Sequence, residues 1–112
     1  MTNAKLAADA RRLAGDKEPY EPEDDIIAGY IDRAITWLTG LRGDALIASD
    51  ESAITVADTP EDLTGDCSLA DVWRECLANY VGSMIAGNPG AMNDSERAAR
   101  LLRRAVELAG SL

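Results

Sequence analysis

The sequence predicts a mainly α-helical protein, a small bundle of about four helices. Apolar residues recur at intervals of three and four in four separate segments, as they do along one face of an α-helix. Capping residues and glycines bound several of these segments. The chain has 112 residues, a length that suits one domain with one small core. We therefore treat residues 1–112 as a single domain.

Residues 1–22 are predicted to form an N-terminal helix followed by a proline-containing linker. The helix covers residues 3–14, where an alanine-rich stripe contains Leu6 and Leu13 and Gly15 supplies the stop. Because small side chains bury little apolar area, we expect this helix to become ordered against a partner. The linker DKEPYEP follows, and each proline in it biases the preceding residue away from helix.

Residues 23–43 are predicted to form the second helix. Its first turn carries three acids, which complement the partial positive charge of a helix N-terminus. Gly40 or Gly43 supplies the stop. At about 100° per residue, its apolar side chains fall on one amphipathic face: Ile26, Ile27, Tyr30, Ala34, Trp37, Leu38 and Leu41.

Residues 44–67 are compatible with a loop containing local helix or with a short β-hairpin between the second and third helices. The runs ALIA and AITVA would be the two strands, with residues 49–52 as the turn. Of the two we favour the hairpin. The polar, turn-rich sequence DTPEDLTGD then leads to the next helix.

Residues 68–110 are predicted to form a helix hairpin. Ser68 followed by Asp71 is typical of a helix N-terminus, and Gly87 ends that helix. Its apolar residues cover about half of the circumference, so we expect it to lie at the centre of the bundle. A second capping pattern at residues 93–96 starts the last helix.

The last helix combines a buried apolar stripe with four arginines on its far side, Arg97, Arg100, Arg103 and Arg104. Two interpretations are open. The arginines form intrahelical ion pairs, Glu96 with Arg100 and Arg103 with Glu107, or they form a cationic ridge for an acidic partner. The interface residues that we predict are the ridge and the apolar positions of the N-terminal segment: Leu6, Leu13, Arg97, Arg100 and Arg104.

Composition argues against chemistry at a reactive site. The chain has no histidine, and its two cysteines, Cys67 and Cys76, do not form a CxxC pair, so we expect no zinc site and no histidine-based catalysis. We predict no catalytic, cofactor-binding or metal site, and no enzyme activity. No apolar run approaches the roughly 20 residues of a membrane span, and we expect a soluble, intracellular protein.

Charge is unevenly distributed along the chain. The net charge is −9, and residues 23–72 carry twelve acids against two bases. Residues 73–112 carry five arginines against four acids. The acidic segment would repel nucleic-acid phosphates and favours either solvation or a basic partner surface.

Four stretches carry a resemblance to a known family: DDIIAGYIDRAITWL, ALIASDESAITVAD, DVWRECLANYVGSMIAGN and SERAARLLRRAVELAG. Their order resembles that of the small helical head-to-tail connector (adaptor) proteins of tailed bacteriophages. The third stretch is the closest likeness, with Trp73 near its start and Tyr80 in its middle. Relatives often have a basic residue soon after this tyrosine, whereas here residues 82–84 are Gly-Ser-Met.

The resemblance implies a structural protein of the virion, assembled in the host cytoplasm. It implies a homo-oligomeric ring on the portal protein that offers a platform to tail components. Neither sequence-specific nucleic-acid binding nor membrane contact is expected.

An alternative hypothesis comes from the charge distribution. A small acidic regulatory module, antitoxin-like or anti-repressor-like, would cover a basic surface of its partner. Neutralising Asp58, Glu61, Asp62 and Asp66 would abolish binding under this hypothesis and separates it from the connector.

Overall fold

A computed structural model describes residues 1–16, 22–88 and 93–112 of the chain. Of the two prolines of the predicted linker, Pro19 lies outside these residues. The described elements are α1 (Asn3–Ala14), α2 (Asp24–Leu41), η1 (Gly43–Leu46), η2 (Asp71–Trp73), α3 (Arg74–Ala86) and α4 (Ser95–Ser111). A mainly helical bundle with four α-helices among the described residues confirms the predicted fold class.

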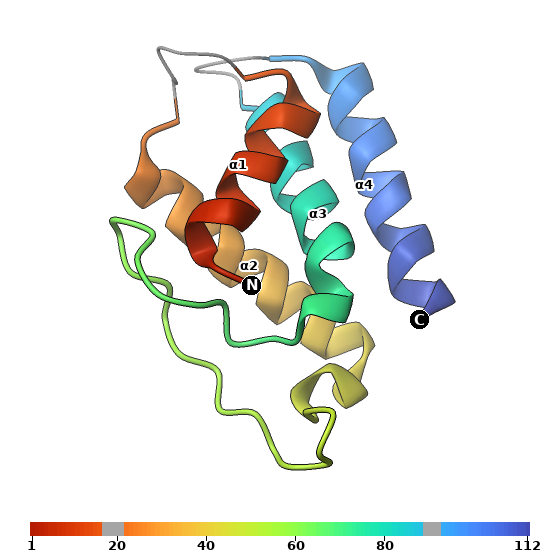
Figure 1. Ribbon diagram of the computed structural model, residues 1–112. Helices are drawn as coiled ribbons and strands as arrows, with labels where there is room; N and C mark the ends of the chain where they lie inside the picture. The colour runs from red at the N-terminus through yellow and green to blue at the C-terminus, as the bar shows by residue number, and fades with distance from the viewer. Residues whose placement is uncertain (17–21, 89–92) are drawn as a thin grey trace.

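Helix α3 is the centre of the bundle. The other three α-helices all pack on it, and α2 and α4 flank it with little direct contact between them (Figure 1). Most of its residues are buried, which confirms the central position that its broad apolar surface predicted. Its buried apolar side chains are Cys76, Leu77, Ala78, Val81, Ile85 and Ala86.

A close crossing joins α1 to α3 at Gly82. A Cβ atom at this position would lie 3.1 Å from the carbonyl oxygen of Ala10 and 3.5 Å from the Cβ atom of Leu13. The alanine-rich face of α1 matches this short distance, because small side chains let helix backbones approach. Leu6 is 0% exposed in the resulting core. Helix α1 therefore packs within its own chain, and the expectation that it needs a partner to become ordered is wrong.

Two helix ends follow the sequence signals. The residue after α1, Gly15, adopts φ 77°, and its N–H donates to the carbonyls of the last turn, as a left-handed glycine cap does. The side chain of Asp94 caps α4 by accepting a hydrogen bond from the Arg97 N–H at 3.0 Å. Capping at these two positions is confirmed.

Two other ends differ from the prediction. Helix α2 continues through Gly40 to Leu41, with Arg42 as its C-cap. The predicted cap at Ser68 is wrong, because the helical region starts only at Asp71 and has no side-chain cap there. The Ser68 hydroxyl instead accepts a hydrogen bond from the Ala57 N–H at 3.1 Å. This hydrogen bond therefore joins two parts of the long loop, residues 47–70, and does not cap the helix.

The predicted β-hairpin in residues 44–67 is also wrong. Of the described residues none forms a strand, and Ile47 and Ala53 make only one isolated antiparallel bridge. Both Ile47 and Val56 are exposed, so the alternating residues have no buried face that would hold a strand register. A hairpin without such a face is marginal in water.

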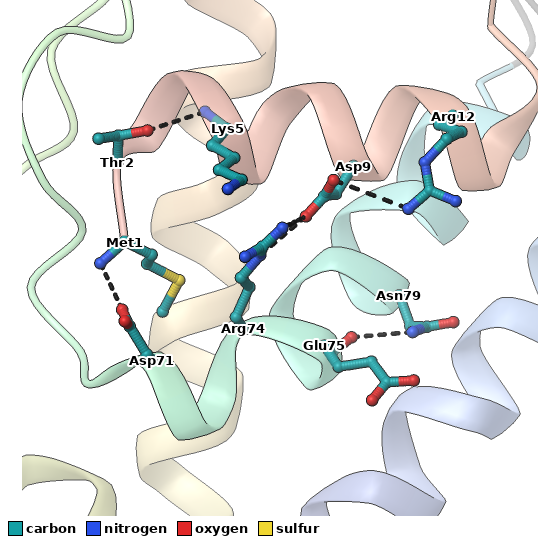
Figure 2. Close-up of polar contacts among 9 residues, drawn as sticks. All are labelled: Met1, Thr2, Lys5, Asp9, Arg12, Asp71, Arg74, Glu75 and Asn79. Atoms are coloured by element: carbon teal, nitrogen blue, oxygen red, sulfur yellow. Dashed lines mark hydrogen bonds and ion pairs between the residues drawn. The ribbon is translucent and has the colours of Figure 1, made fainter.

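Hydrogen bonds and one ion pair hold this long loop against the helices. The Thr59 N–H and hydroxyl both donate to one carboxylate oxygen of Asp32, at 2.9 and 2.7 Å. The Asn3 N–H donates to the Gly65 carbonyl at 3.0 Å. The amino group of Met1 pairs with Asp71 (Figure 2). The loop is therefore attached to α2 and to the start of α1.

A buried ion pair joins the end of α1 to the start of α2. The Arg11 guanidinium lies 2.8 Å from an Asp16 carboxylate oxygen and 3.2 Å from one of Asp24. Both Arg11 and Asp16 are buried, so removal of Arg11 would leave the Asp16 carboxylate uncompensated in the interior.

The Gly82 crossing yields a test of packing. Gly82→Val is expected to lower the free energy of unfolding by about 1–3 kcal/mol, because the new side chain is forced against the backbone of α1. Gly29→Val is the matched control, since a Cβ at Gly29 of α2 meets nothing within 4 Å. Urea denaturation of both variants measures the difference. Equal effects at the two glycines would contradict the close crossing.

The buried thiol of α3 yields a second test. Burial raises the pKa of the Cys76 thiol to about 11, and the thiolate is the form that reacts with alkylating agents. In native protein at pH 8, iodoacetamide should label Cys76 about 100-fold more slowly than an unburied thiol. The rate should increase as pH rises towards the pKa of Cys76. Mass spectrometry before and after unfolding in guanidinium measures it, and rapid native labelling would contradict the packing.

Candidate functional site

A basic cleft lies between α1 and α4, with α3 at its base. Its volume is about 420 Å³. We call it the arginine cleft, and its lining residues are Arg12, Leu13, Asn79, Arg97, Arg100, Leu101 and Arg104. Four of the five interface residues predicted from sequence thus lie together. The fifth, Leu6, lies in the core.

The arginines of α4 do not all reach this cleft. Ala105 and Ala109 are the buried residues of α4. At about 100° per residue, Arg100 and Arg104 lie on the side that turns towards α1. Arg103 points away from that side and does not line the cleft. The predicted ridge of four arginines is therefore split between two sides of the helix.

Arg97 links α4 to the end of α1. Its guanidinium donates to the Ala14 carbonyl at 2.8 Å, where the α1 dipole places partial negative charge. A Cβ atom on the neighbouring Gly15 would lie 1.9 Å from the same guanidinium nitrogen. Gly15 therefore serves both the left-handed cap and the seat of Arg97.

The other arginines of the cleft are held loosely. Arg12 lies 3.7 Å from Asp9, and Arg104 lies 3.9 Å from Glu75 and 3.5 Å from Glu107. All three distances are longer than that of an ordinary charge-assisted hydrogen bond, which is about 2.7–2.9 Å.

Arg100 has no ion pair or hydrogen bond with the part of the chain that the structure describes. The predicted pairs Glu96–Arg100 and Arg103–Glu107 do not form there either, so that interpretation is wrong for both pairs. Among residues 1–16, 22–88 and 93–112, no carboxylate lines the cleft. Much of its positive charge is therefore open to a partner.

A second hollow continues the cleft along α1 and α3. Its volume is about 520 Å³, and Arg12, Leu13 and Asn79 line both spaces. Figure 2 shows its polar wall, where Arg74 donates to one carboxylate oxygen of Asp9 at 2.8 and 2.6 Å. In this hollow acids and bases are paired, so the unbalanced charge is confined to the arginine cleft.

An acidic surface lies at the other edge of the bundle. It is a shallow hollow of about 650 Å³ that also includes Arg11. Figure 1 shows the first turn of α2 at the left edge and α4 at the right edge. We call this surface the acidic hollow, and its acids are Glu23, Asp24, Asp25, Glu61 and Asp62.

Sequence reasoning missed three residues of the arginine cleft, Arg12, Asn79 and Leu101. Arg12 belongs to a segment whose charges balance, and Asn79 and Leu101 belong to helix faces that read as core or as polar surface. Only the contact between α1 and α4 shows that these side chains are neighbours. The only sequence signal that pointed towards a basic site was the uneven distribution of charge along the chain.

Neither a metal site nor a membrane-spanning helix is found in residues 1–16, 22–88 and 93–112. No group of three or more Cys, Asp or Glu side chains there could hold a metal ion. No helix of this part of the chain has the length and apolar character to cross a membrane.

Comparison of the chain with protein-family models, with curated proteins and with solved structures finds no match in any of the three.

Proposed function

We propose that this chain is a structural assembly protein without catalytic activity, and that its arginine cleft holds an acidic segment of a neighbouring protein. The observation that carries the proposal is the composition of the cleft. Of the residues that the structure describes, four arginines and no carboxylate line it, in a chain whose net charge is −9. A local excess of positive charge against the overall balance selects acidic protein segments.

The cleft has the chemistry for such a segment. Guanidinium groups bind carboxylates in a two-pronged geometry. Exposed ion pairs contribute only about 0–1 kcal/mol, so a partner could displace the loose contacts of Arg12 and Arg104 at little cost. Leu13 is only partly buried and, with Leu101, offers apolar area between the arginines. An acidic segment with one aliphatic side chain fits this combination.

Charge complementarity extends the proposal to self-assembly. The first turn of α2, which carries acids of the hollow, and α4, which carries three arginines of the cleft, lie at opposite edges of the bundle (Figure 1), so one copy can present its cleft to the hollow of the next. Such a heterologous contact closes into a ring when the rotation between copies permits. We propose this ring as the connector of a tailed phage, bound to the portal protein and contacted by tail components.

Charge reversal in the cleft tests the proposal. Arg100→Glu with Arg104→Glu should impair assembly by about tenfold or more, because like charges then face each other. Neither side chain is buried, so the helical circular-dichroism signal should remain nearly unchanged. Sedimentation velocity measures assembly of the protein alone and with portal rings of the phage that encodes it.

Two further variants sharpen this experiment. Arg103→Glu is the control for self-assembly, since it changes the same charge on the same helix outside the cleft, and without a partner it should assemble like the unmodified protein. Asp25→Arg with Glu61→Arg should restore assembly of the charge-reversed protein if the hollow is the docking surface. If the protein stays monomeric and does not bind portal rings at any concentration, the connector hypothesis is refuted.

The acidic hollow favours a second candidate function, a regulatory module that covers a basic partner. Five acids converge there from α2 and the long loop, although they lie far apart in the sequence. Neutralising Glu23, Asp25 and Glu61 should then abolish binding of a basic protein, whereas Arg100→Glu should leave that binding unchanged. The connector predicts that both sets of changes affect assembly.

A further inference from the structure

Helix α3 is covered on three sides, and its fourth side is open. Gly82 faces α1. At about 100° per residue, Tyr80 and Met84 lie on the opposite side of α3 from Gly82, and both are only partly buried. Because α2 and α4 flank α3 with little direct contact between them, no helix of the described chain packs across this side.

A groove occupies the open side, between α2 and α4. Its volume is about 450 Å³. Tyr30 from α2 and Leu102 from α4 form its walls, and Tyr80 and Met84 from α3 form its floor. Trp37 stacks on Tyr80 with ring centroids 4.5 Å apart, which fixes one side of the floor. We call this space the apolar groove.

Exposed apolar side chains extend the walls of the groove. On α4, Leu102 is 42% and Val106 is 51% exposed, and their spacing of four residues places them on one side of the helix. On α2, Ile26 and Leu41 are exposed and share the stripe of Tyr30 by helical spacing. The apolar surface therefore continues along both helices beyond the groove itself.

The apolar groove is distinct from the arginine cleft. Leu102 and Val106 lie on the side of α4 that turns towards α2, whereas Arg100 and Arg104 lie on the side that turns towards α1. A ligand of the groove therefore does not compete for the cleft.

Charge narrows the identity of the occupant. Among the described residues, Arg33 is the only charged one that lines the groove, in a chain with 20 acidic and 11 basic residues. Arg103 lies outside the groove itself, but it precedes Val106 by three residues, so the two side chains are neighbours on α4. A positively charged side chain thus lies on each of the two helices that border the groove, Arg33 on α2 and Arg103 on α4. A second copy docked face to face would bring these arginines towards their own equivalents, and like charges oppose that arrangement.

We propose that the apolar groove binds an amphipathic helix of a partner protein, with its apolar face on Tyr80 and Met84 and acidic residues towards Arg33 and Arg103. A helix in this position would give α3 its fourth neighbour. Amphipathic helices bind grooves of this kind through apolar residues at intervals of three and four.

Two synthetic peptides and methionine NMR test the proposal. The first is an acetylated amphipathic helix with leucines at positions i, i+3, i+7 and i+10 and glutamates on both flanks, and the second has lysines in place of the glutamates. In protein labelled at the methionine methyl groups, the glutamate peptide should shift the Met84 signal saturably and leave that of Met1 unchanged. The lysine peptide should bind about tenfold more weakly.

Variants locate the binding site. Leu102→Gln should weaken the glutamate peptide about tenfold through lost apolar contact, whereas Val56→Gln should not. Val56 is the matched control, since it is 44% exposed but lies in the long loop outside the groove. Arg33→Glu should reverse the preference between the peptides. Arg100→Glu should weaken any binding of the glutamate peptide to the arginine cleft but leave the peptide-induced shift of Met84 in place, which separates the two sites.

Three outcomes would overturn the proposal. The glutamate peptide could fail to shift Met84, or both peptides could shift it with equal affinity. The protein alone could form a dimer that Leu102→Gln dissociates, in which case the occupant is a second copy.

Discussion

The structure depends on the close crossing of α1 over α3 at Gly82. A backbone carbonyl of α1 lies 3.1 Å from the place where any other residue would have its Cβ atom, so glycine permits this distance and larger side chains oppose it. The crossing brings the end of α1 beside α4, where Ala14 accepts the hydrogen bond of Arg97. It therefore determines the position of the arginine cleft, and it leaves the opposite side of α3 for the apolar groove.

Helix α4 is the least buried of the four described α-helices. Only Ala105 and Ala109 are buried in it, and small side chains contribute little apolar stabilisation. Hydrogen bonds supplement this packing, from Arg97 to α1 and from the Arg42 guanidinium to the Ala109 carbonyl at 2.6 Å. A helix held in this way exposes two different sides, one basic and one apolar. Both the acidic segment proposed for the arginine cleft and the helix proposed for the apolar groove would contact α4.

The fold keeps opposite charges apart. The acids of the middle segment gather around the start of α2, and the α4 arginines lie at the other edge of the bundle (Figure 1). Some ion pairs hold elements together, such as the buried pair of Arg11 and Asp16, and others lie within one helix, such as Arg104 with Glu107. Exposed charges of this kind contribute little to stability. They do orient a binding partner and select partners of complementary charge.

The sequence by itself determined the helical class, the central helix and the ends at Gly15 and Asp94, because periodicity and capping act within a few residues. It grouped Arg97, Arg100 and Arg104, since one helix face is a local property. Tertiary structure alone decided that Leu6 is core while Leu13 lines a cleft, that Arg12 joins the arginines of α4, and that Ser68 fastens a loop. It also replaced the hairpin with irregular chain, because a strand needs a buried face from distant residues. Which faces meet depends on contacts between segments far apart in the chain, and no local pattern records them.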